Sequence, residues 1–326
     1  MVSKRLGQID VFRGGFWLRI MHMSVPCPSV RFEEGSLLAM RRARIDFENR
    51  ITNRLERILD TNLPTKHVQK EALLFRERDV TMRAGHGRFD LLGPVGPPCW
   101  DLQTFGAGRT RGIIRDTEAK VACGLEGRNA SCVVVSLGSN GQWTFEEDVF
   151  SRTNCRVEVF DCTVDPEEVT VPVYMHHRVR LHYHCVGPPP KSKGKRRIYN
   201  WKVRRFVNTT RTLSFVSYAR ALQLSGIQTA PTFLKMDIEG YEWSVLPQLL
   251  NSGVTSPAQV AMELHFQTQM PGLSWFGRLK SPAELLALGT RLANAGYVIS
   301  QRNDNPNCGK CTELLLVRDP CGERRV

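Results

Sequence analysis

The sequence predicts an α/β fold: a Rossmann-like, doubly wound sheet, mostly parallel, with a C-terminal antiparallel strand pair and an N-terminal helical extension. Short apolar, β-branched runs recur with helix-like segments between them, which is the pattern of buried parallel strands. A small-residue turn or an acidic residue follows several of these runs, as at the ligand-binding edge of open sheets. The last two runs, Tyr297–Ile299 and Thr312–Val317, are joined by a polar turn, which indicates an antiparallel pair.

The first clear strand signal is the apolar run Val133–Val135. The turn Gly138-Ser139-Asn140-Gly141 follows it, and then a helix-like segment that carries Phe145, Val149 and Phe150. Because a glycine backbone turns sharply and lets a ligand approach closely, this strand–turn–helix pattern predicts a ligand site over the turn. We expect Trp143 and Phe145 to lie in the core.

Acidic residues lie at or near the ends of the next apolar runs. Arg156–Phe160 reads as a second strand, and Asp161 follows it 20 positions after Gly141, the spacing of an acidic residue that binds a ribose diol. Phe233–Met236 reads as a further strand that is followed by Asp237 and Glu239, and Val260–His265 contains Glu263. Carboxyl ends of parallel strands share one edge of a sheet, so these carboxylates should lie at that edge.

At these motifs the chain resembles a known family. The turn and the block LKMDIEGYEWSVL (residues 234–246) are similar to FkbM-type class I methyltransferases, which use S-adenosylmethionine. The segments VVSLGSNGQWTFEEDVF and RVEVFDCTVDP resemble the methyltransferase-like proteins of the Methyltransf_22 family more closely. The resemblance covers roughly residues 90 to 318. Class I enzymes often begin the loop with an acidic residue, where this chain has Ser136, and Asn140 replaces the second loop glycine.

The resemblance implies S-adenosylmethionine as cofactor and oxygen as the methyl acceptor. Asp237 is expected to be the base or to position the acceptor, with Glu239 and His265 as further catalytic candidates. An alternative role for Glu239-Gly240 is helix capping and close packing. The expected cofactor-binding residues are Ser136, Gly138, Ser139, Asn140, Gly141 and Asp161.

We therefore expect O-methylation of a sugar-like or small-molecule hydroxyl. A non-catalytic binding or scaffold protein with a methyltransferase fold is the alternative, and loss of cofactor binding would favour it. A nicotinamide-dependent oxidoreductase is a third hypothesis, but the chain has no G-x-G-x-x-G motif.

The formal net charge of +13 favours acidic partners. No zinc-finger spacing or RNP-like motif is present, so we do not expect nucleic-acid binding. The segment Gly187–Arg205 carries eight Lys and Arg residues and reads as a loop: either a solvated one or an electropositive lip for an acidic glycan. The sequence does not predict an oligomeric state.

We divide the chain into a leader (1–35), a helical extension (36–89) and a methyltransferase domain (90–326). Apolar residues at helical spacing predict a helix over 36–60, and Thr212–Leu224 and Pro282–Leu292 read as two more. No run reaches the roughly 18 apolar residues that a spanning helix needs. We expect a cytoplasmic protein, or one in a Golgi-like secretory lumen if the amino terminus is incomplete.

Ten cysteines and two sequons, at Asn129 and Asn208, are compatible with a secreted or lumenal protein. For Cys308 and Cys311 a local disulfide or free thiols is favoured over a redox or zinc role. His182 and His184 alternate on one strand-like run, where a polar strand face is favoured over metal ligands. We therefore expect no metal site.

Overall fold

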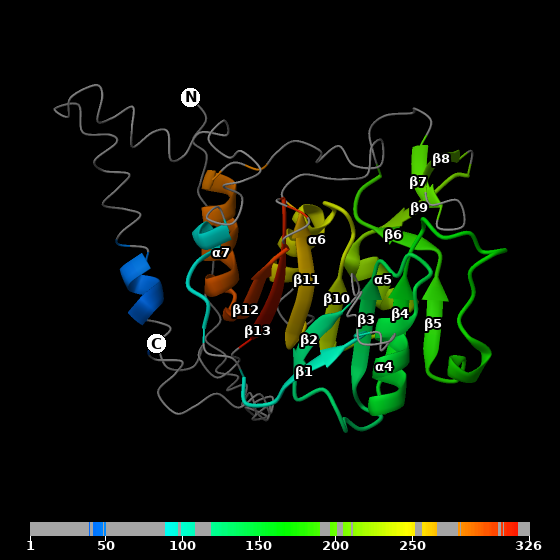
Figure 1. Ribbon diagram of the computed structural model, residues 1–326, viewed down its shortest axis with the longest axis horizontal. Coiled ribbons are helices and arrows are strands. Elements are labelled where there is room, and N and C mark those ends of the chain that lie inside the picture. The colour runs from blue at the N-terminus through cyan, green and yellow to red at the C-terminus, as the bar shows by residue number, and fades with distance from the viewer. Residues whose placement is uncertain are drawn as a thin grey trace, which may run out of the picture.

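A computed structural model gives the fold, and the elements are labelled in Figure 1. It describes residues 39, 42–47, 49, 89–96, 99–107, 119–189, 196–200, 205–209, 211–251, 256–265, 280, 282–305, 308 and 310–318. Everything below refers to these residues. The leader and most of the predicted 36–60 helix lie outside them, although residues 42–47 are helical as expected.

A seven-stranded sheet in the order β12-β13-β11-β10-β3-β4-β5 forms the centre. The five strands β11, β10, β3, β4 and β5 are parallel, and β13 runs antiparallel to both β11 and β12. Figure 1 shows these strands side by side across the molecule. Their bounds are β3 Val133–Leu137, β4 Arg156–Phe160, β5 Val179–His182, β10 Phe233–Met236, β11 Gln259–His265, β12 Tyr297–Asp304 and β13 Cys311–Arg318. The predicted fold class is confirmed.

The chain reverses its direction of travel across the sheet at β3. It passes from β3 to β4 and β5 on one side, and later returns to β10 and β11 on the other. The loops after β3 and β10 therefore leave the same edge in opposite directions, which is where open α/β sheets bind ligands.

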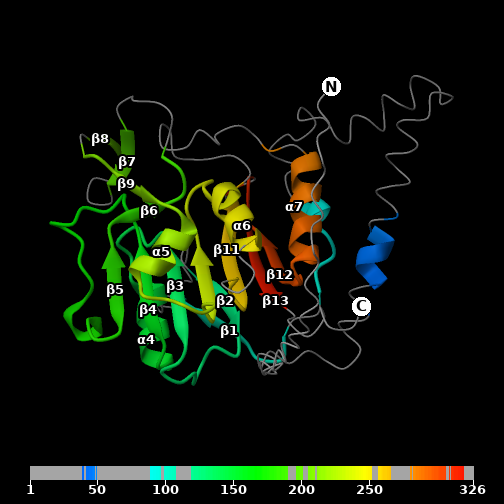
Figure 2. The ribbon, with the colours of Figure 1, turned by 180° about the vertical axis from the view of Figure 1, so that it is seen from behind.

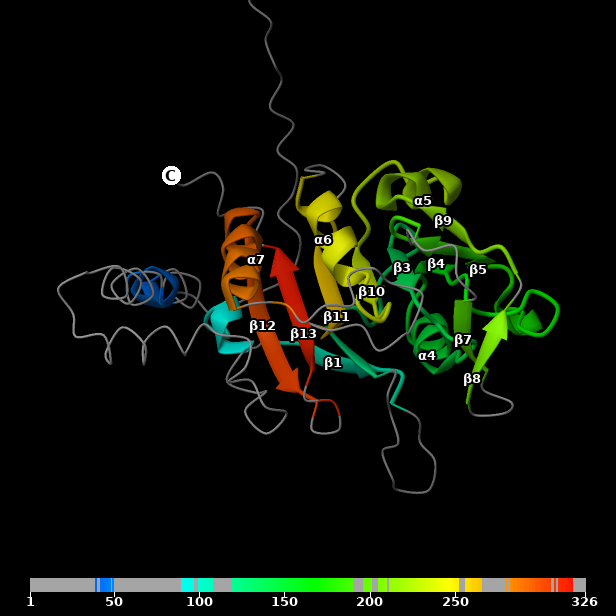
Figure 3. The same ribbon diagram turned by 90° about the horizontal axis from the view of Figure 1, so that it is seen from above.

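Helices cover both faces of the sheet, which explains why its strands read as continuous apolar runs. One core layer lies under α5, α6, α7 and the short helix η3, and the other under α4 and the β1–β2 hairpin. Figure 2 shows α5 and α6 in front of the sheet, and Figure 3 places α4 and β1 on its opposite side. The bounds are η3 Asp90–Leu92, α4 Thr144–Arg152, α5 Tyr218–Leu224, α6 Glu242–Asn251 and α7 Pro282–Asn294.

Several segments differ from the sequence-based expectations. The expected loop Gly187–Arg205 contains a strand, β7 (Arg196–Asn200), which forms a hairpin with β8 (Arg205–Thr209). The expected helix Thr212–Leu224 begins only at Tyr218, because Ser217 caps it and β9 (Ser214–Val216) precedes it. Two further strands, β1 (Leu102–Phe105) and β2 (Lys120–Cys123), lie in a segment without a clear hydrophobic period. The short η4 (Val173–Met175) and β6 (His184–Val186), which pairs with β9, complete the fold.

Four disulfides join described parts of the chain. Cys132–Cys155 links the starts of β3 and β4, and Cys99–Cys123 ties β2 to the segment before β1. The other two are Cys162–Cys185 and Cys308–Cys311, the latter being the favoured local disulfide. Among the described residues, no helix is both long and apolar enough to cross a bilayer.

Helix α7 packs closely on η3. A Cβ added at Gly289 would lie 2.0 Å from the backbone oxygen of Leu92. Although Ala is normally preferred over Gly within a helix by about 1 kcal/mol, we predict that Gly289→Ala lowers the free energy of unfolding by about 2 kcal/mol through overpacking. Denaturant unfolding measures this change. The control Ala287→Gly, at an exposed position of the same helix, should lose about 1 kcal/mol from helix propensity alone, and a stabilised Gly289→Ala would contradict the close contact.

Candidate active site

The loop after β3 lies directly against the backbone that follows β10. Gly138 has a φ of +81°, and a Cβ there would lie 1.9 Å from the backbone oxygen of Asp237. The Asp237 amide also donates to the oxygen of Leu137 at 3.0 Å. Only glycine fits at position 138, for reasons of both φ and space. Asn140 has a φ of +54°, a left-handed value that asparagine tolerates better than most residues.

Asp161, which is buried, holds this loop in place. Its Oδ2 accepts hydrogen bonds from the amides of Ser139 (3.0 Å) and Asn140 (2.6 Å). Its Oδ1 accepts from the amide (2.8 Å) and the hydroxyl (2.6 Å) of Thr163. A carboxylate has about four lone-pair sites, so these four bonds make Asp161 the anchor of the loop. Its expected ribose contact stays a prediction, and a diol would have to share these oxygens.

Polar groups fill the space beneath the loop, on the sheet face that α4 covers. The Ser136 hydroxyl donates to Glu146 Oε1 at 2.6 Å, and both residues are fully buried. Lys235, which pairs with Ser136 across β3 and β10, donates to the backbone oxygen of Gly138. The carboxylate that class I enzymes often carry at the first loop position is therefore replaced by a serine that has a carboxylate from α4 next to it.

A second polar group gathers where β10, β11 and β13 lie side by side. Met236 pairs with Met262, so the next residues, Asp237 and Glu263, follow on neighbouring strands, and Glu263 pairs with Glu313 on β13. Residues in register on adjacent strands present their side chains to the same face, about 5 Å apart. Three carboxylates from distant parts of the sequence thus meet, and ligand atoms of Asp237, Glu263 and Glu313 lie within 4.8 Å of one another.

Lys120 of β2 supplies a buried positive charge to this group. Its ammonium lies 3.3 Å from Asp237 Oδ2 and 3.0 Å from Glu313 Oε1. Burial alone would raise the pKa of Asp237, but Lys120, His265 and Lys235 together hold it below its usual value. Burial raises the pKa of Glu313 to about 7, although Lys120 acts in the opposite direction. Asp237 is therefore an ionised carboxylate at neutral pH.

His265, at the end of β11, points its ring into the same group. Its Nδ1 lies 3.3 Å from Glu242 Oε1, and its Nε2 lies 3.5 Å from Glu239 Oε2 and 3.6 Å from Glu263 Oε2. Burial acts to lower the pKa of His265, but Glu242, Glu239 and Asp237 outweigh it and raise the pKa well above its usual value. The Trp243 indole donates to the His265 backbone oxygen at 2.6 Å.

Glu239 lies in the turn before α6, and Glu242 is the first residue of α6. The Glu242 carboxylate accepts the amides of Ile238 and Gly240, each at 2.9 Å, so Glu242 rather than Glu239 satisfies the backbone here. Glu239 has a φ of +55°, a conformation that costs a non-glycine residue about 1 kcal/mol or more. Its side chain is 42% exposed, yet burial of the carboxyl and the neighbouring carboxylates raise its pKa to about 7 against the opposite effect of His265.

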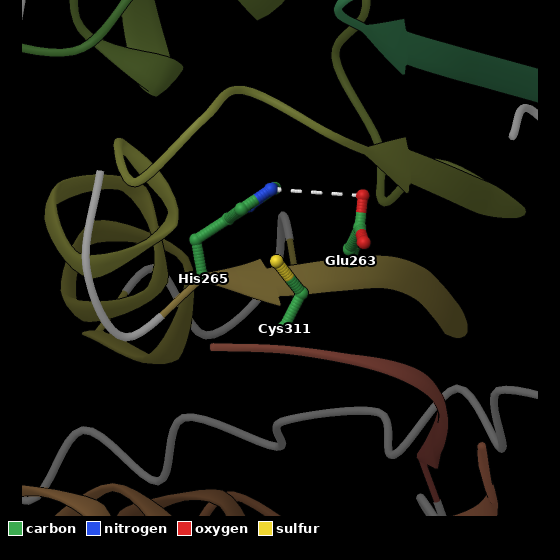
Figure 4. A group of neighbouring side chains, drawn as sticks. All are labelled: Glu263, His265 and Cys311. Carbon is green, nitrogen blue, oxygen red and sulfur yellow. Dashed lines mark ion pairs between the residues drawn. The ribbon is translucent and has the colours of Figure 1, made fainter. Parts of the chain in front are cut away.

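Figure 4 shows Cys311 beside Glu263 and His265, and the ligand atoms of the three lie within 4.8 Å of one another. The dashed line in Figure 4 joins His265 and Glu263. Cys311 is bonded to Cys308, so its sulfur carries no thiolate charge in this form.

The structure brings the predicted residues into two adjoining groups. Gly138, Ser139, Asn140, Gly141 and Asp161 form the loop and its anchor, with Ser136 beneath it. Asp237, Glu239 and His265 meet beside Gly138. Sequence reasoning missed Lys120, Lys235, Glu146, Glu242 and Glu313. Of these, Glu313 left a signal, because it is the one charged residue of the apolar stretch Thr312–Val317. His182, by contrast, pairs with Glu158 at 2.7 Å and stacks on Phe160, whereas His184 contacts Ser214, so the two histidines do not converge.

The pair Ser136–Glu146 leads to a prediction. Ser136→Asp restores the acidic residue that is common at this loop position, but it places a second carboxylate beside buried Glu146. We predict that Ser136→Asp lowers the free energy of unfolding by about 3 kcal/mol at neutral pH, because it sets two buried carboxylates side by side. Thermal or denaturant unfolding measures the change. The neutral variant Ser136→Asn is the control and should lose less, and an unchanged or more stable Ser136→Asp would contradict the pairing.

Comparison with solved structures finds distant similarities. The chain resembles a fibrillarin pre-rRNA processing protein from Methanococcus jannaschii at 8% identity and a TM-score of 0.35, over 61% of this chain and 70% of that one. It resembles an O-methyltransferase family protein from Burkholderia thailandensis at 13% identity and a TM-score of 0.31, over 87% of this chain and 72% of that one. A 1,6-didemethyltoxoflavin-N1-methyltransferase from the same organism is similar at 17% identity and a TM-score of 0.29, over 59% and 72%. Likenesses this distant carry no argument about chemistry.

A comparison with curated proteins finds no match. A family model, Methyltransf_22, described as a methyltransferase domain, matches residues 116–318, which is more than half of the chain. The match spans β3 to β13, and therefore both the loop and the carboxylate group described above. The resemblance noted in the sequence is confirmed: this chain belongs to the Methyltransf_22 family of methyltransferase domains.

Proposed function

We propose that this protein is an S-adenosylmethionine-dependent O-methyltransferase. In this proposal the cofactor binds over the loop Gly138–Gly141 beside Asp161. The acceptor hydroxyl binds next to it, against Asp237, Glu239 and His265.

One observation carries the proposal: the loop and the carboxylate group adjoin across the seam between β3 and β10. Gly138 lies against the backbone oxygen of Asp237, and Lys235 of β10 donates to the oxygen of Gly138. A donor held by the loop and an acceptor held by the carboxylates would therefore be neighbours. Holding two reactants in contact is the largest contribution that a transferase of this kind needs from its protein.

Two glycines allow the loop to pack closely in the shape that the proposal requires. A Cβ at Gly141 would lie 3.2 Å from two side-chain carbons of Val169, and one at Gly138 would collide with the backbone oxygen of Asp237. S-adenosylmethionine supplies a methyl group on a positively charged sulfur. Asp161 fixes the loop amides and lies at the end of β4, where the sheet can offer a carboxylate to a ribose.

The residues of the second group would orient the acceptor and take up its proton. The C–S bond breaks as the O–C bond forms, the sulfur keeps the electron pair, and the hydroxyl proton leaves. Asp237 is held ionised by Lys120 and can accept a hydrogen bond from the acceptor hydroxyl and then its proton. Glu239 and His265 lie within reach of the same position as further candidates.

The acceptor is proposed to be acidic. The segment 191–205 carries eight Lys and Arg residues. Its hairpin β7–β8 lies beyond the carboxyl end of β5, on the edge of the sheet that also bears the loop (Figure 1). Three of the eight, Arg196, Arg197 and Arg205, belong to this hairpin, and positive charge attracts anionic molecules. Carboxylated or sulfated glycans and small molecules are the acceptor class that we propose.

We also infer that the protein folds in an oxidising compartment such as the secretory lumen. Disulfides persist in such compartments and are rare in the cytosol, and four of them join described residues here. The sequon asparagine Asn129 is exposed in a turn, where its Oδ1 accepts the hydroxyl of Ser131 at 2.6 Å. Exposure is what a glycosylated asparagine requires.

A non-catalytic role is the second candidate, and one observation favours it. All four hydrogen bonds that Asp161 accepts come from the protein itself. If these bonds do not rearrange, no lone pair remains for a ribose, and the fold would act as a binding or scaffold module.

The first prediction concerns cofactor binding by the loop. The wild-type protein should bind S-adenosylmethionine and S-adenosylhomocysteine in the micromolar range by calorimetry, and Gly138→Ala should abolish binding because its methyl group displaces the loop from Asp237. Gly226→Ala is the matched control: Gly226 also has a positive φ, +65°, but nothing lies within 4 Å of an added Cβ. A folded wild-type protein that binds neither compound would support the scaffold alternative.

The second prediction separates binding from turnover. Once an acceptor is found, starting with acidic glycans, Asp237→Asn should keep cofactor affinity and lower kcat by about 100-fold or more, the usual effect of losing a proton acceptor. Release of S-adenosylhomocysteine measures turnover. Equal turnover of Asp237→Asn and wild type would remove Asp237 from the chemistry.

The compartment has its own prediction. Replacing both Cys132 and Cys155 by Ala opens a link across 23 residues, which should lower the free energy of unfolding by about 3 kcal/mol. Unfolding of the wild type and of this double variant, each with and without reductant, shows whether the bond forms. Reductant should lower the free energy of unfolding of the wild type more than that of the variant. The inference would be contradicted if the protein were produced in an oxidising compartment and mass spectrometry found all eight cysteines of the four disulfides as free thiols.

A further inference from the structure

A fixed partner orients the His265 ring toward the carboxylate group. Its Nδ1 lies 3.3 Å from Glu242 Oε1, and Glu242 is itself held by two backbone amides at 2.9 Å. This carboxylate holds the ring so that Nε2 faces the carboxylate group. The same arrangement orients histidines that bind metal ions, whose second ring nitrogen almost always donates to a carboxylate or a carbonyl.

Nε2 then faces two carboxylate oxygens. Glu239 Oε2 lies at 3.5 Å and Glu263 Oε2 at 3.6 Å, which is long for a hydrogen bond. Donor atoms that share one metal ion at about 2.1 Å are separated by about 3.0 to 3.4 Å, for octahedral or tetrahedral ligands. The observed spacing is close to that of atoms around a common cation, and Asp237 lies within 4.8 Å of both Glu239 and His265.

We propose that Asp237, Glu239 and His265, whose ligand atoms lie within 4.8 Å of one another, form a binding site for a divalent first-row metal ion, with Glu263 Oε2 3.6 Å from the same His265 nitrogen. A set of carboxylates with one imidazole suits Mn²⁺ better than Mg²⁺ or Ca²⁺, which prefer oxygen alone. This site differs from the sequence-based expectation that the protein has no metal site, because β11, α6 and the end of β10 meet only in the fold.

The neighbouring groups set the limits of the site. Lys120 contacts both Asp237 and Glu313; of the two, only Asp237 has a ligand atom in the group with Glu239 and His265, so Glu313 is left out of the proposed ligands. Cys311 is close, but its sulfur is bonded to Cys308. The Glu239 side chain is 42% exposed and those of Asp237 and Glu263 are each 13% exposed, whereas the Glu239 Oε2 atom that faces His265 is buried.

The proposed ion has a chemical role that rests on the proposed methyl transfer. A cation beside Asp237 would bind the acceptor oxygen, orient it and favour loss of its proton. Metal binding itself does not depend on that role, and it can be measured with neither cofactor nor acceptor present.

The experiment is a titration of chelator-treated, full-length protein with Mn²⁺, followed by the electron paramagnetic resonance signal of the free ion. We expect saturable binding to one site by the wild type. Glu239→Gln, which keeps the size of the side chain, should weaken the affinity by about 10-fold or more, and Glu242→Gln by about 10- to 100-fold through the orientation of His265.

Glu158→Gln is the matched control, since Glu158 is a buried glutamate that pairs with a histidine, His182, elsewhere in the sheet. It should leave Mn²⁺ affinity unchanged. Mn²⁺ should also raise the Tm of the wild type. A measurable Tm of Glu239→Gln shows that the variant is folded, and the absence of a rise with Mn²⁺ shows that it has lost the site. No binding up to millimolar Mn²⁺, or equal binding by Glu239→Gln, would overturn the proposal and leave a protonated His265 between the two glutamates. Mn²⁺ binding without cofactor binding would uphold this site and contradict the proposed function.

Discussion

The close contact between Gly138 and the backbone of Asp237 is the constraint on which the site depends. It joins the loops that leave β3 and β10 in opposite directions, and it is possible only because position 138 has no Cβ. Lys235 strengthens the contact from below by donating to the Gly138 oxygen. Asp161 holds the far side of the same loop through two amides. The position of the loop relative to the carboxylates is thus fixed from three directions.

The same region buries an unusual amount of charge, and its partners are arranged accordingly. Lys120 is almost fully buried between Asp237 and Glu313, and Glu242 joins the turn before α6 to His265. Buried charges are costly unless they are paired and hydrogen-bonded. Removing one member would leave another without a partner, so these residues depend on one another. Such a group is more readily explained by chemistry than by stability, because an apolar core of the same volume would be at least as stable.

Much of the sheet and part of the candidate site could be predicted from the sequence. The strands β3, β4, β10 and β11 are apolar runs of the right length, and the turn and acidic residues that follow them are local signals. Asp237 is the predicted base, with Glu239 and His265 as further candidates, and the structure places the three side by side because β10 and β11 are neighbours. The hairpin β7–β8 was read as a loop because its Lys and Arg residues hide the alternation that marks a strand.

The residues that were missed depend on contacts between distant segments. Lys120 lies on a four-residue strand in a segment with no clear period, and its role appears only where β2 reaches β11 and β13. Glu146 is one of two adjacent glutamates at the start of α4, and no sequence pattern distinguishes it from Glu147. Such partners follow from the register and the layer order of the sheet, which a single sequence does not contain.

The central claim is that cofactor and acceptor meet at the seam between β3 and β10. A crystal structure of the protein with S-adenosylhomocysteine tests it most directly. The account predicts the ligand over residues 138–141, with its ribose near Asp161 and its sulfur turned toward Asp237. A ligand bound elsewhere, or one whose sulfur is turned away from Asp237, would contradict it.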